Sequence, residues 1–218
     1  IVYDDTLYFT ANDSIVGEEL WKYKGISSPV LVEDVFAGPL NSSPSQKEVF
    51  NDKLYFSATD TNFGDELYEY TDTGGVKLVL DIYPGKPNAT PTFLTNYNGE
   101  LYFAANNGIV GNELYKFDGI NDTVVADIRP GFFNSNPAGL IVYNNQLFFS
   151  ADDGTNGIEL WMYDAVLDTA VLFDINLSGS SNPSDFVVAY GKLYFTANDG
   201  IHGREHWGYD GVNNPRLL

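Results

Sequence analysis

The 218-residue sequence predicts an all-β fold, a five-bladed β-propeller with four antiparallel strands in each blade of about 47 residues. The first observation is a Leu-aromatic-Phe tripeptide that returns at steps of 47, 47, 46 and 46 residues, beginning at Leu7, Leu54, Leu101, Leu147 and Leu193. The second is a Gly ten residues and a Glu twelve residues after each Leu: Gly17, Gly64, Gly111, Gly157, Gly203, and Glu19, Glu66, Glu113, Glu159, Glu205. The third is the lack of helical periodicity. Together they predict one small sheet, copied five times.

The third copy shows how each blade is divided. Residues 94–97 and 100–105 are apolar runs joined by Asn98-Gly99, a dipeptide that favours a two-residue type I′ hairpin turn. A polar loop that contains Gly111 leads to a third predicted strand at 112–117, and a turn leads to a fourth at 123–128. A connection rich in Asn and Pro then runs to the next copy.

The strands are apolar on both faces, as in residues 101–105, so both faces of each sheet are expected to be covered. Aromatic residues fill four fixed offsets in all five copies and account for 20 of the 33 aromatics. Because large rings bury the most surface per residue, we expect most of them in the core between blades.

The repeats divide a single domain into blades at approximately 1–47, 48–94, 95–140, 141–186 and 187–218. The last copy ends in Pro215–Leu218, where the fourth strand begins. Five copies predict a ring that closes without a blade shared between the two ends. The chain begins at Ile1 without Met, which fits a processed chain or a segment of a longer array.

The amino-acid composition limits the classes of partner that the chain can bind. Eleven Lys and Arg against 30 Asp and Glu give a net charge of −19, which argues against nucleic acid and against an anionic membrane surface. No apolar run reaches about 18 residues, so no direct membrane insertion is expected. The absence of Cys excludes a disulfide framework and a thiolate site, and it suits an extracellular protein stabilised by repeat packing as well as a cytosolic one.

Five N-x-S/T sequons, slightly more than chance predicts, fall in predicted loops and are possible glycosylation sites: Asn12, Asn41, Asn88, Asn121 and Asn176. They favour a secreted protein, located outside the cell or on its surface.

Several segments support a resemblance to a known family. Residues 19–23, 113–119 and 159–164, together with Asp81–Gly85 and Asp127–Gly131, resemble the ELWxxDGT repeat family over the whole chain. The resemblance implies propeller-type repeats of secreted and surface proteins, and it implies no enzymatic activity. Two copies depart from the pattern: His206 replaces the Leu, and Thr71–Thr73 stands where Asp-Gly is typical.

No catalytic residues are predicted, and we expect a protein that is not an enzyme. His202 and His206 occur only in the last copy, and no nucleophile, phosphate-binding or dinucleotide motif is present in a suitable context. Five-bladed propellers include glycoside hydrolases, but these need carboxylates with different roles. A Glu that recurs five times predicts equivalent environments instead.

The recurring Glu opens the third strand on the aromatic side, so it is expected to be partly buried and to need hydrogen-bond donors. Two interpretations remain open. The Glu accepts backbone N–H groups of its own hairpin loop or of a neighbouring blade, or it binds a metal together with loop carboxylates. For the second interpretation, calcium is the possible cofactor and Asp153 and Glu159 are the candidate ligands.

The loops after the second strand and the connections between blades should emerge on one rim, opposite the tight hairpins. They carry short amides and carboxylates, which can hold sugar hydroxyls or calcium but are also common turn formers. The candidate ligand-binding residues on this rim are Asn12, Asp13, Asp60, Asn107, Asp153, Asp199, Asn41, Asn88 and Asn134.

These observations favour an extracellular binding or adhesion module, lectin-like, with several equivalent sites between blades whose avidity compensates for weak single-site affinity. Its partners would be glycans or other surface proteins. The alternative is a structural subunit of a surface layer, a filament or a larger repeat array, in which self-assembly is possible and the repeats serve packing alone.

Overall fold

The computed structural model describes all 218 residues and contains five four-stranded antiparallel sheets, each formed from consecutive strands. The first sheet comprises β1 (Val2–Tyr3), β2 (Thr6–Asn12), β3 (Glu18–Tyr23) and β4 (Val30–Glu33). The second comprises β5 (Ser45–Phe50), β6 (Lys53–Asp60), β7 (Gly64–Thr71) and β8 (Gly75–Leu80). The third comprises β9 (Thr92–Tyr97), β10 (Glu100–Asn106), β11 (Asn112–Phe117) and β12 (Asp122–Ala126).

The fourth sheet comprises β13 (Ala138–Tyr143), β14 (Gln146–Asp152), β15 (Ile158–Asp164) and β16 (Thr169–Phe173). The fifth comprises β17 (Ser184–Ala189), β18 (Lys192–Asn198), β19 (Arg204–Tyr209) and β20 (Arg216–Leu217). The structure contains no helix, and hence none long and apolar enough to cross a membrane. The prediction of an all-β fold with four strands per copy is therefore confirmed.

The first strand of each copy after the first begins three residues earlier than the boundary placed from the sequence. In the second copy β5 begins at Ser45, and a bulge follows between the register pairs of Ser45 and Glu48. Similar irregularities interrupt the first hairpin of the third, fourth and fifth sheets. A bulge adds an unpaired residue to a strand, so the apolar pattern alone does not show where pairing begins.

At the hairpin turn, Asn98 and Gly99 both have positive φ (51° and 78°), as the type I′ turn requires.

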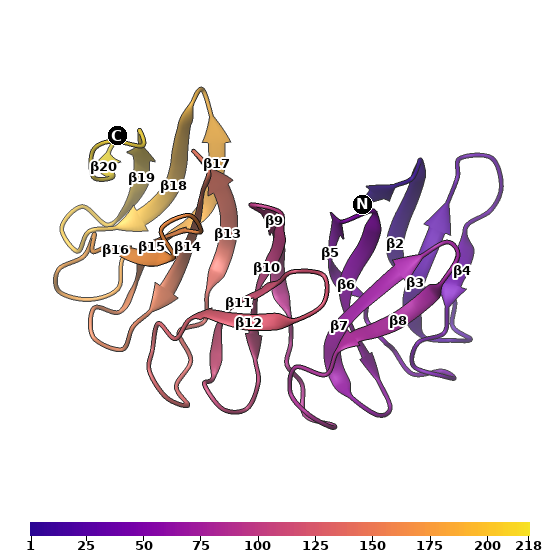
Figure 1. Cartoon of the computed structure of the whole chain (residues 1–218). Helices are drawn as coiled ribbons and strands as arrows, with labels where there is room; N and C mark the ends of the chain where they lie inside the picture. Colours follow the sequence, from indigo (N-terminus) through magenta and orange to yellow (C-terminus); the bar gives the residue numbers. More distant parts are fainter.

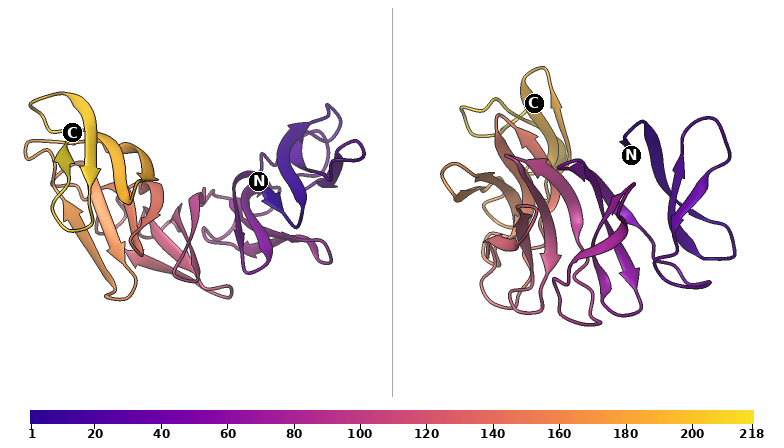
Figure 2. Two further views of the ribbon diagram at one scale, coloured as in Figure 1. Left: turned by 90° about the horizontal axis from the view of Figure 1, so that it is seen from above. Right: turned by 45° about the vertical axis from the view of Figure 1, so that its right-hand side comes forward.

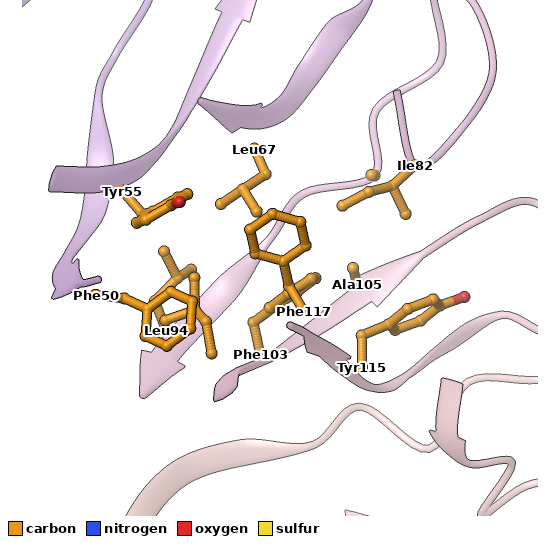
Figure 3. Close-up of a cluster of buried hydrophobic side chains, with 11 residues drawn as sticks. Phe50, Tyr55, Leu67, Ile82, Leu94, Phe103, Ala105, Tyr115 and Phe117 are labelled. Carbon is orange, nitrogen blue, oxygen red and sulfur yellow. The ribbon is translucent and has the colours of Figure 1, made fainter. Parts of the chain in front are cut away.

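Consecutive sheets pack face to face, and each of the four interfaces contains its own cluster of buried apolar side chains. Between the second and third sheets, Phe50, Tyr55 and Leu67 lie against Phe103 and Phe117 (Figure 3). The ring centroids of Tyr55 and Phe117 are 5.8 Å apart. These clusters confirm that the recurring aromatics form the core between sheets.

The five sheets follow an open arc (Figure 1). In the two further views the first and last sheets lie at opposite ends, and no core cluster joins them (Figure 2). The ring closure expected from five copies is thus absent from this structure. Apolar strands require that their faces be covered, but they do not require the cover to come from the other end of the same arc.

Candidate functional site

The loops after the second strands and the connections between sheets meet on one rim, as the strand order predicts. Asn41, Asn88 and Asn134 lie in successive connections, and each side-chain oxygen accepts a backbone N–H at or next to the start of a third strand. For Asn134, this donor is the amide of Asn112 at 2.7 Å. In the next connection Ser180 takes the same role toward Ile158. These predicted ligand-binding amides therefore hold the rim together.

The recurring Gly is explained by the contact between its loop and the connection to the next sheet. Gly111 has φ +79°, and a Cβ built there would lie 2.2 Å from the carbonyl oxygen of Phe133 in the connection. Gly17, Gly64 and Gly157 have similar positive φ and equally close neighbours, whereas a Cβ at Gly203 would meet open space. Glycine is required where the backbone is left-handed and another segment approaches it closely.

The predicted acidic and amide residues of the loops are turn formers in this structure. Asp13, Asp60, Asn107, Asp153 and Asp199 each accept the backbone N–H groups two and three residues later. Asn12 accepts the amide of Ser14 in the same way. At Asp199 these bonds stabilise the charged carboxylate, and with the His202 amide as the largest cause they lower its pKa to about 2. In each of these side chains, one oxygen thus already accepts backbone N–H groups of its own loop.

The recurring Glu is fully buried in the first four copies and clamps the connection to the next sheet. Glu113 accepts the amides of Ile128 (2.9 Å) and Ser135 (2.8 Å) and the Ser135 hydroxyl (2.6 Å). Glu19 and Glu159 make the same three types of bond. Of the two interpretations left open, the structure shows the hydrogen-bonded one for these glutamates. Glu205 is exposed, because the donors to the other glutamates lie 15 to 23 residues further along the chain, which for Glu205 is past Leu218.

Burial changes the acidity of these glutamates. Desolvation raises the pKa of Glu113 to about 7, opposed by the hydrogen bonds from Ser135 and Ile128. It raises the pKa of Glu66 to about 8, where Ala89 replaces the serine and no hydroxyl is available to the carboxylate.

This acidity predicts a stability that depends on pH. A carboxyl with a raised pKa binds its proton more tightly when folded, so its stabilising contribution is complete below its unfolded pKa of about 4.3 and is lost as the pH rises through the folded value. The free energy of unfolding should therefore increase from about pH 8 to about pH 5. Chemical denaturation across this range measures it. Glu66→Gln should flatten the dependence, and a flat wild-type profile would contradict the explanation.

The candidate metal ligands have protein partners already. Asp153 accepts the amides of Thr155 and Asn156 and the side-chain amide of Asn156, and Glu159 accepts donors of Ile175 and Ser181. No group of three or more His, Cys, Asp or Glu side chains is arranged to hold a metal ion. Calcium binding stays a prediction without a formed site to support it.

Four of the five sequon asparagines are exposed: Asn12, Asn41, Asn88 and Asn121. Asn176 is only 8% exposed, and its side-chain nitrogen donates to the carbonyl oxygen of Ser180. Since a glycan is attached at that nitrogen, the structure opposes glycosylation at Asn176. The loop position was predicted correctly, but the burial of the side chain was not.

A polar cavity of about 510 Å³ lies on the rim between the third and fourth copies. Arg129 enters it from the connection and donates to Asp152 at 2.6 Å, at the end of β14. The other lining residues come from the loop after β14 and the connection after β16: Gly154, Thr155, Asn156, Gly157, Asp174, Asn176, Leu177, Ser178 and Gly179. Ten of the eleven lining residues are therefore not hydrophobic, and the volume suits a small polar ligand.

Two aromatic rings stand beside this cavity. Phe132 and Phe133 are 76% and 51% exposed, with ring centroids 4.6 Å apart. The guanidinium carbon of Arg129 lies 5.5 Å from the centroid of Phe133, so the rings and the cavity are joined through Arg129. Sequence reasoning missed these residues. The sequence feature that could have identified them is a difference between copies: Arg129 stands at the position that Phe36, Tyr83 and Asn176 have in the other copies.

Comparisons with known proteins show the fold alone. No family model and no curated protein sequence matches the chain. Solved structures match it, among them an enzyme of Niastella koreensis designated GH74, at 14% identity and a TM-score of 0.61, over 99% of this chain and 36% of that one. TolB from Acinetobacter baumannii matches at 14% identity and a TM-score of 0.54, over 99% and 53%. Puromycin hydrolase matches at 14% identity and a TM-score of 0.58, over 92% and 32%.

The chain thus spans about a third to a half of the length of these structures. Such low identities carry no activity over to it. The likeness to these solved structures indicates that the five sheets have a β-propeller-like arrangement.

Proposed function

We propose that this chain is a non-enzymatic binding module of an extracellular or surface protein, built from five consecutive propeller blades, and that it recognises the hydroxyl groups of a neutral glycan. The observation that carries the proposal is the cavity at Arg129, which joins a polar lining to an exposed aromatic pair. Contiguous exposed apolar groups bordered by polar residues are typical of ligand-binding surfaces.

The chemistry of the cavity fits a sugar. Hydroxyl groups both donate and accept, and here the carboxylates of Asp152 and Asp174 accept while the guanidinium of Arg129 donates. The apolar C–H face of a sugar ring can lie against Phe132 or Phe133. The lining carries two carboxylates against one guanidinium, which favours a neutral ligand over an anionic one.

The site differs from the several equivalent sites expected from the repeats. The recurring rim residues are used by their own turns, and the pairing of Arg129 with Asp152 occurs in one copy only. We therefore propose one principal site per chain, with avidity arising from several chains on a surface.

A glycan array followed by calorimetry on the retained sugars tests this proposal. Arg129→Ala should weaken binding at least about tenfold, equivalent to about 1.4 kcal/mol. Lys53→Ala removes another half-exposed ion pair, with Glu69, and should leave binding unchanged. Absence of binding to any sugar, or equal affinity of the two variants, would reject a carbohydrate site at Arg129.

A further inference from the structure

The first sheet exposes a face that every other sheet buries. Leu7 is 42% exposed and Tyr23 is 36% exposed. Their counterparts in the other four copies are at most 7% exposed: Leu54, Leu101, Leu147, Leu193, and Tyr70, Phe117, Tyr163, Tyr209. This face, formed by Leu7, Phe9, Trp21 and Tyr23, is called the leading face below.

Two hollows lie over the leading face. One, of about 550 Å³, is lined by Leu7, Phe9, Tyr23 and residues 27–29, and the other, of about 290 Å³, extends past Trp21 to Asp13. An exposed apolar face beside two hollows is typical of a contact surface.

The four internal interfaces show what covers such a face. In each, an aromatic ring on the second strand of one sheet packs against the aromatic ring near the end of the third strand of the next sheet. The pairs, with centroids 5.4–5.9 Å apart, are Tyr8–Tyr70, Tyr55–Phe117, Tyr102–Tyr163 and Phe148–Tyr209. Two members of this series have no partner. They are Tyr23 on the leading face and Tyr194 on the outer face of the last sheet.

The outer face of the last sheet is called the trailing face. Its cross-strand register places Tyr194 and Thr196 on the same side as His206, opposite Thr196, and Lys192 lies two residues before Tyr194. His206 is exposed in the position where Leu20, Leu67, Leu114 and Leu160 are fully buried. Arg204 also lies on this side and donates to Thr196. The trailing face is thus an incompletely covered surface with several basic groups.

Charge favours contact between the two faces. Residues 187–218 contain three Asp or Glu and three Lys or Arg, so the net charge of −19 comes entirely from the other copies. The first copy, residues 1–47, has seven acidic side chains against three basic ones, and Asp13 lines one of its hollows. Asp13 beside the leading face is complementary to Lys192 on the trailing face, where Arg204 is already paired with Asp185 at 3.4 Å.

We propose that the trailing face of one chain docks on the leading face of a second copy of the same chain, so that the stack of sheets continues head to tail between molecules. The two faces lie at opposite ends of the arc, which favours contact between chains over contact within one chain (Figure 2). The contact would pair Tyr194 of one copy with Tyr23 of the other and would repeat the ring geometry of the four internal interfaces. Such a heterologous contact builds closed rings or filaments.

Sedimentation equilibrium over a wide concentration range tests the proposal. The wild-type chain should form oligomers of increasing mass, and Leu7→Asp and Tyr194→Asp should each reduce the mass to the 24.1 kDa of a single chain. An equimolar mixture of these two variants should form dimers and nothing larger, because each chain retains one intact face. Ile120→Asp, at an exposed apolar side chain in the turn between β11 and β12, is the control that should assemble normally.

Circular dichroism melting of each variant separates lost docking from lost folding. Wild-type protein that stays monomeric at every concentration would overturn the proposal, and a compact monomer in X-ray scattering would indicate closure within one chain instead. Oligomers that persist in Leu7→Asp, or a mixture of the two variants that stays monomeric, would also overturn it. None of these outcomes depends on the glycan site.

Discussion

Replacing Glu113 with alanine should lower the free energy of unfolding by about 3–5 kcal/mol, because the substitution leaves the amides of Ile128 and Ser135 and the Ser135 hydroxyl buried without an acceptor. Each unsatisfied buried donor costs about 1–3 kcal/mol. Urea denaturation monitored by tryptophan fluorescence measures the change.

The chain provides a matched control for this substitution. Glu205 has the same place in the repeat but is exposed. Glu205→Ala should therefore change the free energy of unfolding by no more than about 0.5 kcal/mol. Similar losses for the two variants would show that the effect comes from strand propensity or net charge, and would contradict a clamp formed by the buried carboxylate.

Gly111→Val should destabilise the protein by about 3 kcal/mol or more, since it adds both backbone strain and a collision. A valine at φ +79° is strained, and its Cβ would lie 2.2 Å from the carbonyl oxygen of Phe133, so the connection must move. Thermal unfolding followed by circular dichroism should show a clear decrease in Tm.

Gly203→Val separates the two contributions. Gly203 has φ +84° but open space around a built Cβ, so valine there should cost only the backbone strain, about 1–2 kcal/mol. If both variants lose the same stability, the close approach of the connection contributes nothing, and the explanation for the recurring Gly reduces to its φ angle.

Much of the architecture could be predicted because local chemistry determines it. The Asn98-Gly99 dipeptide can adopt two successive positive φ angles, which identifies the hairpin and the strands on either side. The Gly and Glu recur at fixed offsets because, in each of the first four copies, both contact the connection that leads to the next sheet. A contact made at the same place in every copy therefore appears in the sequence as a fixed spacing.

Other features depend on what lies across the structure, and spacing does not record them. Asn176 reads as a surface loop residue, but its side chain turns inward to Ser180. The sequence likewise predicted covered faces but not the open arc, because apolar residues show that a face needs a cover without identifying it.

The buried glutamate also affects how such a protein can change in length. Glu113 and Ser135 are 22 residues apart, and Glu159 and Ser181 are separated by the same distance, so both members of each clamp lie within one copy. A gene duplication or deletion of one whole period therefore adds or removes a glutamate together with its own donors. No clamp is broken at the junction, and each added sheet brings one new interface of the existing type. Recombination in whole periods can thus lengthen or shorten the arc without new packing having to evolve.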